Sequence, residues 1–219
     1  MGKSIDHIFE VFRSVADPEK AAPMSAYMRD QFFFLGIPTP ERKRSSRDFL
    51  KTLGKKSVDW DFIFECWQQP EREFQYLAKD YLAKAKAVLT PSDMPNLREL
   101  VIRKSWWDTV DGLGVIVGDV ALRYPEVNDT LLNWSVDENF WLRRLAIDHQ
   151  LGRREKTDTL LLERILMNNF GQTEFFINKA IGWALRDYSK TNSDWVRDFI
   201  ERHRGEMASL SIREASKYV

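Results

Sequence analysis

The stretch EFFINKAIGWALRDYSK, residues 174–190, indicates how this chain folds, because its apolar side chains recur at the spacing of an α-helix. One stripe can pack into a core and consists of Ile177, Ala180, Ile181, Ala184, Leu185 and Tyr188. A second stripe carries Phe176, Lys179, Trp183, Arg186 and Lys190. Since packing does not require Trp183, the second stripe is either a half-buried surface or a face that stacks on a ligand and contacts phosphate groups.

Helical spacing of apolar residues extends over almost the whole chain. Only 10 Gly and 8 Pro interrupt it, and no segment alternates long enough to require a strand. The pattern predicts an all-α fold with helices over residues 5–14, 19–31, 40–53, 59–68, 71–89, 96–104, 106–123, 126–135, 138–151, 158–169, 174–190, 193–203 and 211–218.

Two of these helices have start signals in the sequence. Thr39 offers an N-cap with Pro40 at the first helical position. Ser105 and Asp108 have the spacing of a capping box. We therefore expect helices to begin directly after Thr39 and Ser105.

The helices can be paired into units of roughly 30 to 45 residues, the length of HEAT-type repeats. With 219 residues, the chain is long enough for one large domain. The expected architecture is an α-solenoid of about six HEAT-like helical pairs, forming a single domain over residues 1–219 with a concave face for a partner.

Composition excludes several classes of protein. Hydrophobic residues make up 43% and charged residues 30%, as in a folded protein rather than a disordered one. The formal net charge is +0, so any site for a polyanion must come from local clusters such as residues 41–56, which include Arg42 and Arg47, or residues 143–156, which include Arg144. Each cluster on its own is more typical of a solvated helix face.

Cofactor chemistry and a membrane location are not expected. The three His residues have no Cys or carboxylate at ligand spacing, and the chain has no glycine-rich phosphate loop, so we expect neither a metal nor another cofactor. Cys66 is the only cysteine and lies in an apolar run, as expected of a buried residue in a reducing compartment. No leader and no membrane-spanning stretch is evident, which predicts a cytoplasmic protein.

A second group of interest is Trp106, Trp107 and Asp111. In a helix that begins at Trp106, Trp107 and Asp111 share one face, while Trp106 points about a hundred degrees away. One indole can then anchor the core while the other lies beside a carboxylate, an arrangement suited to a cationic ligand. The alternative is that Asp108 and Asp111 only favour the helix N-terminus.

The chain contains several short sequence segments that, taken in this order, resemble those of a known protein family. They are AYMRDQF at 26–32, LGIPTPER at 35–42, PEREFQ at 70–75, KSWWDTVD at 104–111, WLRR at 141–144 and FFINKAIGWALR at 175–186. Together they resemble the AlkD family, the HEAT-like-repeat alkylpurine DNA glycosylases. The similarity extends from about residue 23 to SIREA at 211–215.

The resemblance implies a DNA glycosylase that hydrolyses the N-glycosidic bond of positively charged N3- and N7-alkylated purines in duplex DNA, without base flipping. Asp111, Trp107 and Trp183 match the catalytic positions, and Arg144 matches a residue that grips the DNA backbone. Tyr27 falls at another active-site position, and we expect Lys179, Arg186, Arg42 and Arg47 to contact DNA as well. The expected partner is duplex DNA containing alkylated bases, and the protein is expected to be a monomer.

The chemistry accounts for these residue types. An alkylated purine is already a cationic leaving group, so one ionised carboxylate near the sugar suffices to stabilise the oxocarbenium-like deoxyribose and to place water. Two other functions stay open: a non-catalytic protein that binds branched DNA on the same scaffold, and a helical-repeat scaffold for protein interactions.

Overall fold

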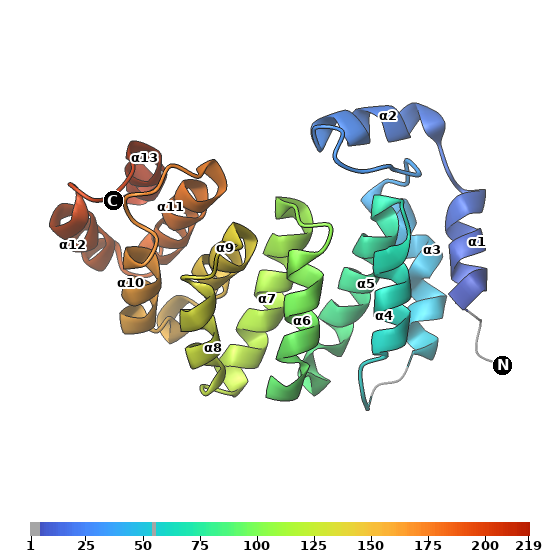
Figure 1. Cartoon of the computed structure of the whole chain (residues 1–219), viewed down its shortest axis with the longest axis horizontal. Helices are drawn as coiled ribbons and strands as arrows, with labels where there is room; N and C mark the ends of the chain where they lie inside the picture. Colours follow the sequence, from blue (N-terminus) through green and yellow to red (C-terminus); the bar gives the residue numbers. More distant parts are fainter. Residues whose placement is uncertain (1–4, 54–55) are drawn as a thin grey trace. The chain divides into compact units, whose positions relative to one another are not determined.

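The computed structural model describes residues 5–53 and 56–219, and the regular secondary structure in this part of the chain consists of helices (Figure 1). Within it there is no β-strand, only an isolated bridge between Phe33 and Glu71. The helices are α1 (Ile5–Ser14), α2 (Pro18–Tyr27), α3 (Thr39–Thr52), α4 (Trp60–Gln68), α5 (Arg72–Ala85), α6 (Met94–Ile102), α7 (Trp107–Arg123), α8 (Val127–Trp134), α9 (Phe140–Asp148), α10 (Thr159–Met167), α11 (Phe175–Ser189), α12 (Ser193–His203) and α13 (Ser209–Ala215). The predicted all-α fold is confirmed. Residues 1–4, to which the expectation of no leader applies, and residues 54 and 55 of the charged segment 41–56 lie outside the described range.

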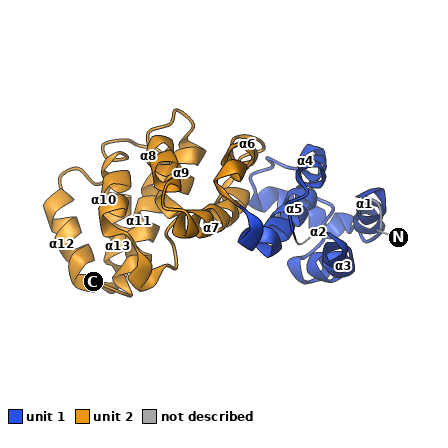
Figure 2. Ribbon diagram, turned by 90° about the horizontal axis from the view of Figure 1, so that it is seen from below, with its two compact units in different colours: residues 1–89 blue, residues 90–219 orange. Residues whose placement is uncertain are grey.

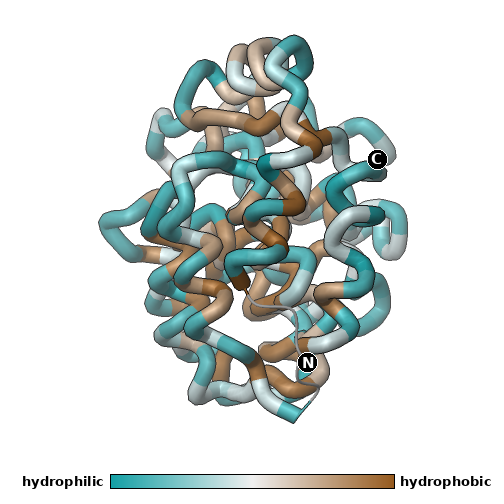
Figure 3. The backbone as a smooth tube through the Cα atoms, turned by 90° about the vertical axis from the view of Figure 1, so that its right-hand side faces the viewer, coloured by the Kyte–Doolittle hydropathy of each residue, from teal (hydrophilic) through white to brown (hydrophobic). Residues whose placement is uncertain are grey.

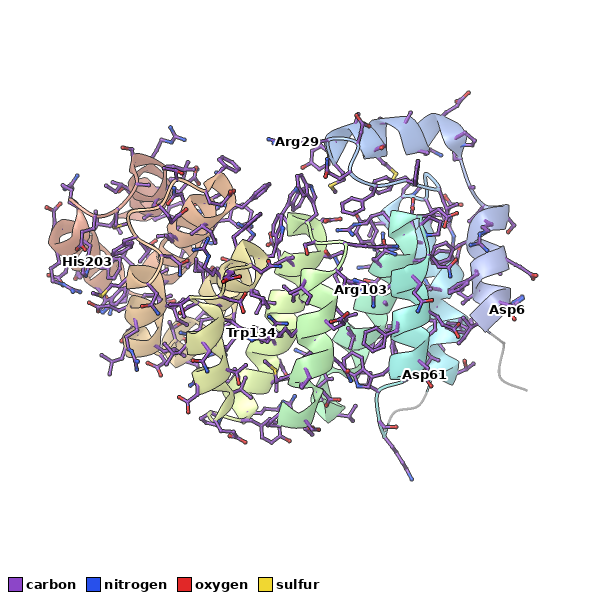
Figure 4. The ribbon with its side chains drawn as sticks, in the orientation of Figure 1. Asp6, Arg29, Asp61, Arg103, Trp134 and His203 are labelled. Carbon is purple, nitrogen blue, oxygen red and sulfur yellow. The ribbon has the colours of Figure 1, made fainter. Side chains whose placement is uncertain are left out.

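Most helices begin and end close to the predicted positions, with two clear differences. The helix predicted over 19–31 ends at Tyr27, because Arg29 and Asp30 both take positive φ values of 56° and turn the chain. Arg29 is labelled in Figure 4, directly after α2. The helix predicted over 71–89 ends at Ala85 and is followed by a 3₁₀ turn, Lys86–Val88.

The starts of α3 and α7 differ from the N-caps that the sequence predicts. Thr39 is already the first residue of α3, one position later in the helix than predicted. The capping box at Ser105 is wrong: the Ser105 hydroxyl donates to the Val101 carbonyl at 2.6 Å, and Trp106 precedes α7 without a side-chain cap bond. Ser105 thus closes the end of α6 instead of opening α7.

Two compact units make up the chain, residues 1–89 and residues 90–219 (Figure 2). In unit 1, α3 packs against α1 and α5, and α4 packs against α5; α2 runs crosswise to α1, α4 and α5 in Figure 1. In unit 2, the alternate helices α7, α9, α11 and α13 pack in series, and α8 contacts both α9 and α10. Such ordered packing of alternate helices is typical of a helical-repeat solenoid. The single-domain organisation over residues 1–219 stays a prediction, which a single cooperative unfolding transition would support.

Apolar side chains fill the interior of each unit, and the chain alternates between hydrophobic and hydrophilic segments along the helices (Figure 3). Cys66 is 0% exposed, which confirms its expected burial. The buried carboxylate of Glu73 accepts hydrogen bonds from the backbone N–H groups of Leu35, Gly36 and Ile37 at 2.9, 2.9 and 3.1 Å. These bonds fasten the loop after α2 to the start of α5. Among the described helices, none has the length and apolarity needed to cross a membrane.

Candidate active site

Close packing of α7 against α9 determines where Asp111 lies. Gly118, two turns after Asp111, leaves room for α9: a Cβ atom at this position would overlap the carbonyl oxygen of His149. The Gly118 carbonyl also accepts a hydrogen bond from Arg153 at 2.7 Å. Any larger residue would force the two helices apart. The glycine therefore holds α7 near the charged residues of α9.

Asp111 and Arg144 form a two-bond ion pair between α7 and α9. The Arg144 Nε donates to Asp111 Oδ1 at 2.8 Å, and Nη2 donates to Oδ2 at 2.9 Å. The third nitrogen, Nη1, donates to the Phe176 carbonyl of α11 at 2.6 Å. The Arg144 side chain is only 2% exposed, whereas the Asp111 side chain is 24% exposed. Arg144 therefore fixes the carboxylate from the protein side and leaves part of it open to solvent.

Trp183 of α11 completes this group. The Arg144 guanidinium carbon lies 5.6 Å from the centroid of the Trp183 ring, and that of Arg186 lies 5.7 Å from it, both within cation–π range. The indole is half-buried. Three helices, α7, α9 and α11, thus bring Asp111, Arg144 and Trp183 together.

The two neighbouring indoles at the start of α7 have different surroundings. The Trp106 ring packs 5.7 Å from Trp141 and 5.3 Å from Phe176, centroid to centroid, inside an aromatic cluster that joins α7, α9 and α11. Trp107 is half-buried and lies one helical turn before Asp111. Trp106 is half-buried like Trp107, and its ring is the one of the two that packs into this aromatic cluster.

A second carboxylate, Asp148, lies near Arg144 from one turn further along α9. The Asp148 Oδ2 atom is 3.8 Å from Arg144 Nε, and the residue is 2% exposed. Burial raises the pKa of Asp148 to about 7; the charge of Arg144 opposes this rise and that of Asp111 adds to it. Burial also lowers the pKa of Arg144, but Asp148 and Asp111 outweigh this effect and raise it overall. Arg144 is therefore permanently charged, while Asp148 can change its charge near neutral pH.

In the sequence, Asp148 belongs to the charged segment 143–156, whose pattern is typical of a solvated helix face. Its spacing of four residues from Arg144 could have linked the two residues, because this spacing places both side chains on one face of α9. Charge patterns alone do not show that this face is buried.

A cluster of cations surrounds Glu214 at the contact between α11 and α13, and we call it the Glu214 cluster. Glu214 lies 2.9 Å from Lys179, 2.8 Å from Arg186 and 2.9 Å from Lys217. Hydrogen bonds from Lys217 and Lys179 lower the pKa of Glu214 to about 2. Three cations share one carboxylate, so the cluster keeps a net charge of about +2. Sequence reasoning identified Lys179 and Arg186 but missed Glu214.

Two of the arginines expected to contact DNA, Arg144 and Arg42, are buried inside the protein. Arg144 is buried, and each nitrogen of its guanidinium donates within the protein. Arg42 is 5% exposed, pairs with Asp80 at 3.3 Å and lies 4.8 Å from the Tyr76 ring centroid. A phosphate could reach either arginine only by replacing these contacts. The helical charge pattern did not reveal that burial.

Other expected contacts are open to solvent. Tyr27 is 71% exposed, and Arg47 is exposed on α3. Arg47 lines a groove of about 390 Å³ between α3 and α5, together with Lys43 and Lys84. These residues belong to unit 1, whereas Asp111, Trp183 and the Glu214 cluster belong to unit 2.

Among the described residues, no three His, Cys, Asp or Glu side chains are grouped so as to hold a metal ion. Burial lowers the pKa of His149, next to Asp148, to about 3, so its imidazole stays neutral at physiological pH.

Comparison with known proteins gives the family. Residues 8–219 match the family described as DNA alkylation repair enzyme. A solved structure described as a predicted DNA alkylation repair enzyme from Enterococcus faecalis shares 38% sequence identity with a TM-score of 0.86, covering 93% of this chain and 96% of that one. Among curated proteins, none matches. The chain, with its helical-repeat fold and its Asp111 site, therefore belongs to the DNA alkylation repair enzyme family and has a role in DNA repair.

Proposed function

We propose that this protein is a DNA glycosylase that removes positively charged N3- and N7-alkylated purines from duplex DNA by hydrolysis of the N-glycosidic bond. The observation that carries the proposal is the Asp111 carboxylate, held by two hydrogen bonds from buried Arg144 and still 24% exposed. A carboxylate fixed in this way keeps its geometry while charge develops next to it, which is the condition for electrostatic catalysis.

The proposed reaction needs no general acid. When the C1′–N bond breaks, its electron pair passes to the cationic base, which leaves as a neutral purine. The deoxyribose becomes an oxocarbenium-like cation, and the negative charge of Asp111 stabilises it. Water then adds to C1′ and loses a proton to Asp111 or to solvent, which gives an abasic site and the free base.

Trp183 and Trp107 have supporting roles in this proposal. An indole face attracts a cation, and Trp183 already holds two guanidinium groups near its ring. We assign both indoles to contact with the cationic base and the sugar edge. The resemblance that led to this assignment also implies that the base stays in the helix instead of being flipped, which we include in the proposal.

DNA binding is assigned to local clusters of charge, since the formal net charge of the chain is +0. The Glu214 cluster in unit 2, with Lys179 27% and Arg186 26% exposed, can contact phosphates while Glu214 holds the cations in place. In unit 1, the groove lined by Arg47 offers a second group of cations, and Tyr27 of the same unit is exposed. Arg144 is assigned to positioning Asp111. A monomeric, cytoplasmic protein is part of the same proposal.

A second candidate function is DNA binding without excision. It is favoured by the same ion pair, because a guanidinium on Asp111 offsets the negative charge that catalysis requires. Incubation with duplex DNA containing N7-methylguanine distinguishes the two functions, with the free base measured over time. Release of base above the spontaneous rate supports the glycosylase, and salt-dependent binding without release supports the second candidate.

A further inference from the structure

The ion pair between Asp111 and Arg144 raises an electrostatic problem for the proposed function. Catalysis requires a net negative charge beside the sugar, yet the guanidinium that positions Asp111 carries a full positive charge. Opposite charges joined at 2.8 and 2.9 Å form a dipole, whose field is weaker and falls off faster with distance than that of a lone carboxylate. A further negative charge is needed for the group to be anionic.

Asp148 is placed to supply that charge. Its carboxylate lies 3.8 Å from Arg144 Nε, on the same helix and one turn further on. Within the described part of the chain, neither of its oxygens has a hydrogen-bond partner, although the residue is almost fully buried. A buried carboxyl group without a hydrogen bond is costly, and the feature nearby that offsets the cost of its charge is Arg144.

We propose that Asp148 is a positioning residue that sets the net charge of the Asp111 site through Arg144, and that its ionisation switches base excision on. This proposal rests on the glycosylase function proposed above. With Asp148 ionised, the group of Asp111, Arg144 and Asp148 carries a net charge of about −1. With Asp148 protonated, Arg144 neutralises Asp111 and the group is close to neutral.

We expect Asp148 to titrate in a single step, because few charged groups act on its carboxyl group. Arg144 on α9 and Asp111 on α7 act on it, and His149 is buried and neutral. Several other charged residues on the helices packed against α9 form ion pairs with different partners: Arg98 with Asp137, Glu99 with Arg103, Asp119 with Arg123, Glu163 with Arg202, and Lys179 and Arg186 with Glu214. The remaining charged residues are not among the groups that shift the pKa of Asp148; these are Asp108, Asp129, Arg164 and Asp187 on the packed helices and Arg143 on α9. Because the pKa of Asp148 is about 7, the switch falls within the physiological range.

The test is the pH profile of kcat for release of N7-methylguanine by the full chain, from pH 5.5 to 8.5. The cationic base needs no proton to leave, and the same profile measured with Asp148→Asn separates titration of the protein from titration of the base itself. In the wild type, kcat should rise through an apparent pKa near 7. Asp148→Asn should flatten the profile and lower kcat at pH 8 on the order of tenfold, the effect of a unit charge at roughly 10 Å in a medium of effective dielectric constant about 20. KM should change little, because Asp148 is too deeply buried to reach DNA.

Asp137→Asn is the matched control, since Asp137 pairs with Arg98 and accepts from the Asn139 N–H instead of facing Arg144. It should keep the wild-type pH profile. A merely structural role for Asp148 would lower activity equally at all pH values and leave the apparent pKa in place, and that result would overturn the proposal.

A second measurement does not depend on catalysis. In protein labelled with ¹³C at the Asp carboxyl groups, the Asp148 carbon should titrate near pH 7, and the Asp111 carbon should shift over the same interval in the wild type but not in Asp148→Asn. Absence of this coupled shift would overturn the proposal. Coupled titration without base release in the wild type would instead refute the glycosylase function and, with it, the proposed switch in excision.

Discussion

Replacing Arg144 with Met tests whether this arginine is an internal positioning residue or a surface contact. The variant keeps an unbranched side chain but loses three hydrogen bonds, two to Asp111 and one to the Phe176 carbonyl. It also leaves Asp148 buried without its counter-charge. Removing one partner from a buried ion pair lowers the free energy of unfolding by about 3–5 kcal/mol, and we expect a loss of this size at pH 8.

The loss should depend on pH. In the folded wild type, Asp148 holds its proton up to a pKa of about 7, whereas in the unfolded chain it loses the proton near 3.8. The folded state therefore binds more protons between these values, so this contribution to stability is complete at low pH and is lost as pH rises through 7. Without Arg144 the pKa of Asp148 rises further. The destabilisation of Arg144→Met should therefore be at least about 1 kcal/mol larger at pH 8 than at pH 5.5.

Urea unfolding followed by circular dichroism at both pH values measures these quantities. Adding Asp148→Asn to Arg144→Met removes the stranded charge and should recover part of the loss at pH 8. An arginine that contacts DNA from the surface would change stability by less than about 0.5 kcal/mol when replaced. A loss below about 1 kcal/mol at both pH values would refute the internal role of Arg144.

Three further predictions concern other parts of the chain. Glu73→Gln should lower the free energy of unfolding by about 2 kcal/mol or more, because an amide cannot accept from all three N–H groups of the loop; unchanged urea unfolding would contradict this. Gly118→Ala should cost about 1–3 kcal/mol, since its Cβ would overlap the His149 carbonyl, and an unchanged Tm would show that α7 and α9 can move apart freely. Lys179→Ala should reduce the salt slope of DNA binding by roughly one and Glu214→Gln should steepen it; equal slopes in the two variants would exclude the Glu214 cluster from the DNA interface.

Much of the fold could be predicted from the sequence, because apolar residues at helical spacing report which face of each helix is buried. In α11, Ile177, Ala180 and Leu185 are buried as the stripe predicted, and Trp183 is half-buried on the other stripe. The end of α2 was missed because Arg29 and Asp30 are not residues that signal a positive φ as glycine does.

The candidate site was predicted less completely, because burial of a charged residue depends on neighbours distant in the sequence. Arg144 and Arg42 both looked like surface cations, yet each is paired inside its unit, with Asp111 and Asp80 respectively. Those pairs span 33 and 38 residues. No local pattern contains such a pairing, whereas the shared face of Trp107 and Asp111 follows from one helical turn alone.

The most direct test of the proposed chemistry compares Asp111→Asn with Asp108→Asn in release of N7-methylguanine from duplex DNA at pH 8. Asp111→Asn retains the size of the side chain but removes its charge, so excision should fall about 10²-fold or more while DNA affinity survives. Asp108 is a carboxylate in the first turn of the same helix, and its replacement should leave the rate close to that of the wild type. Full activity in Asp111→Asn, or an equal loss in both variants, would contradict the assignment of Asp111 as the catalytic residue.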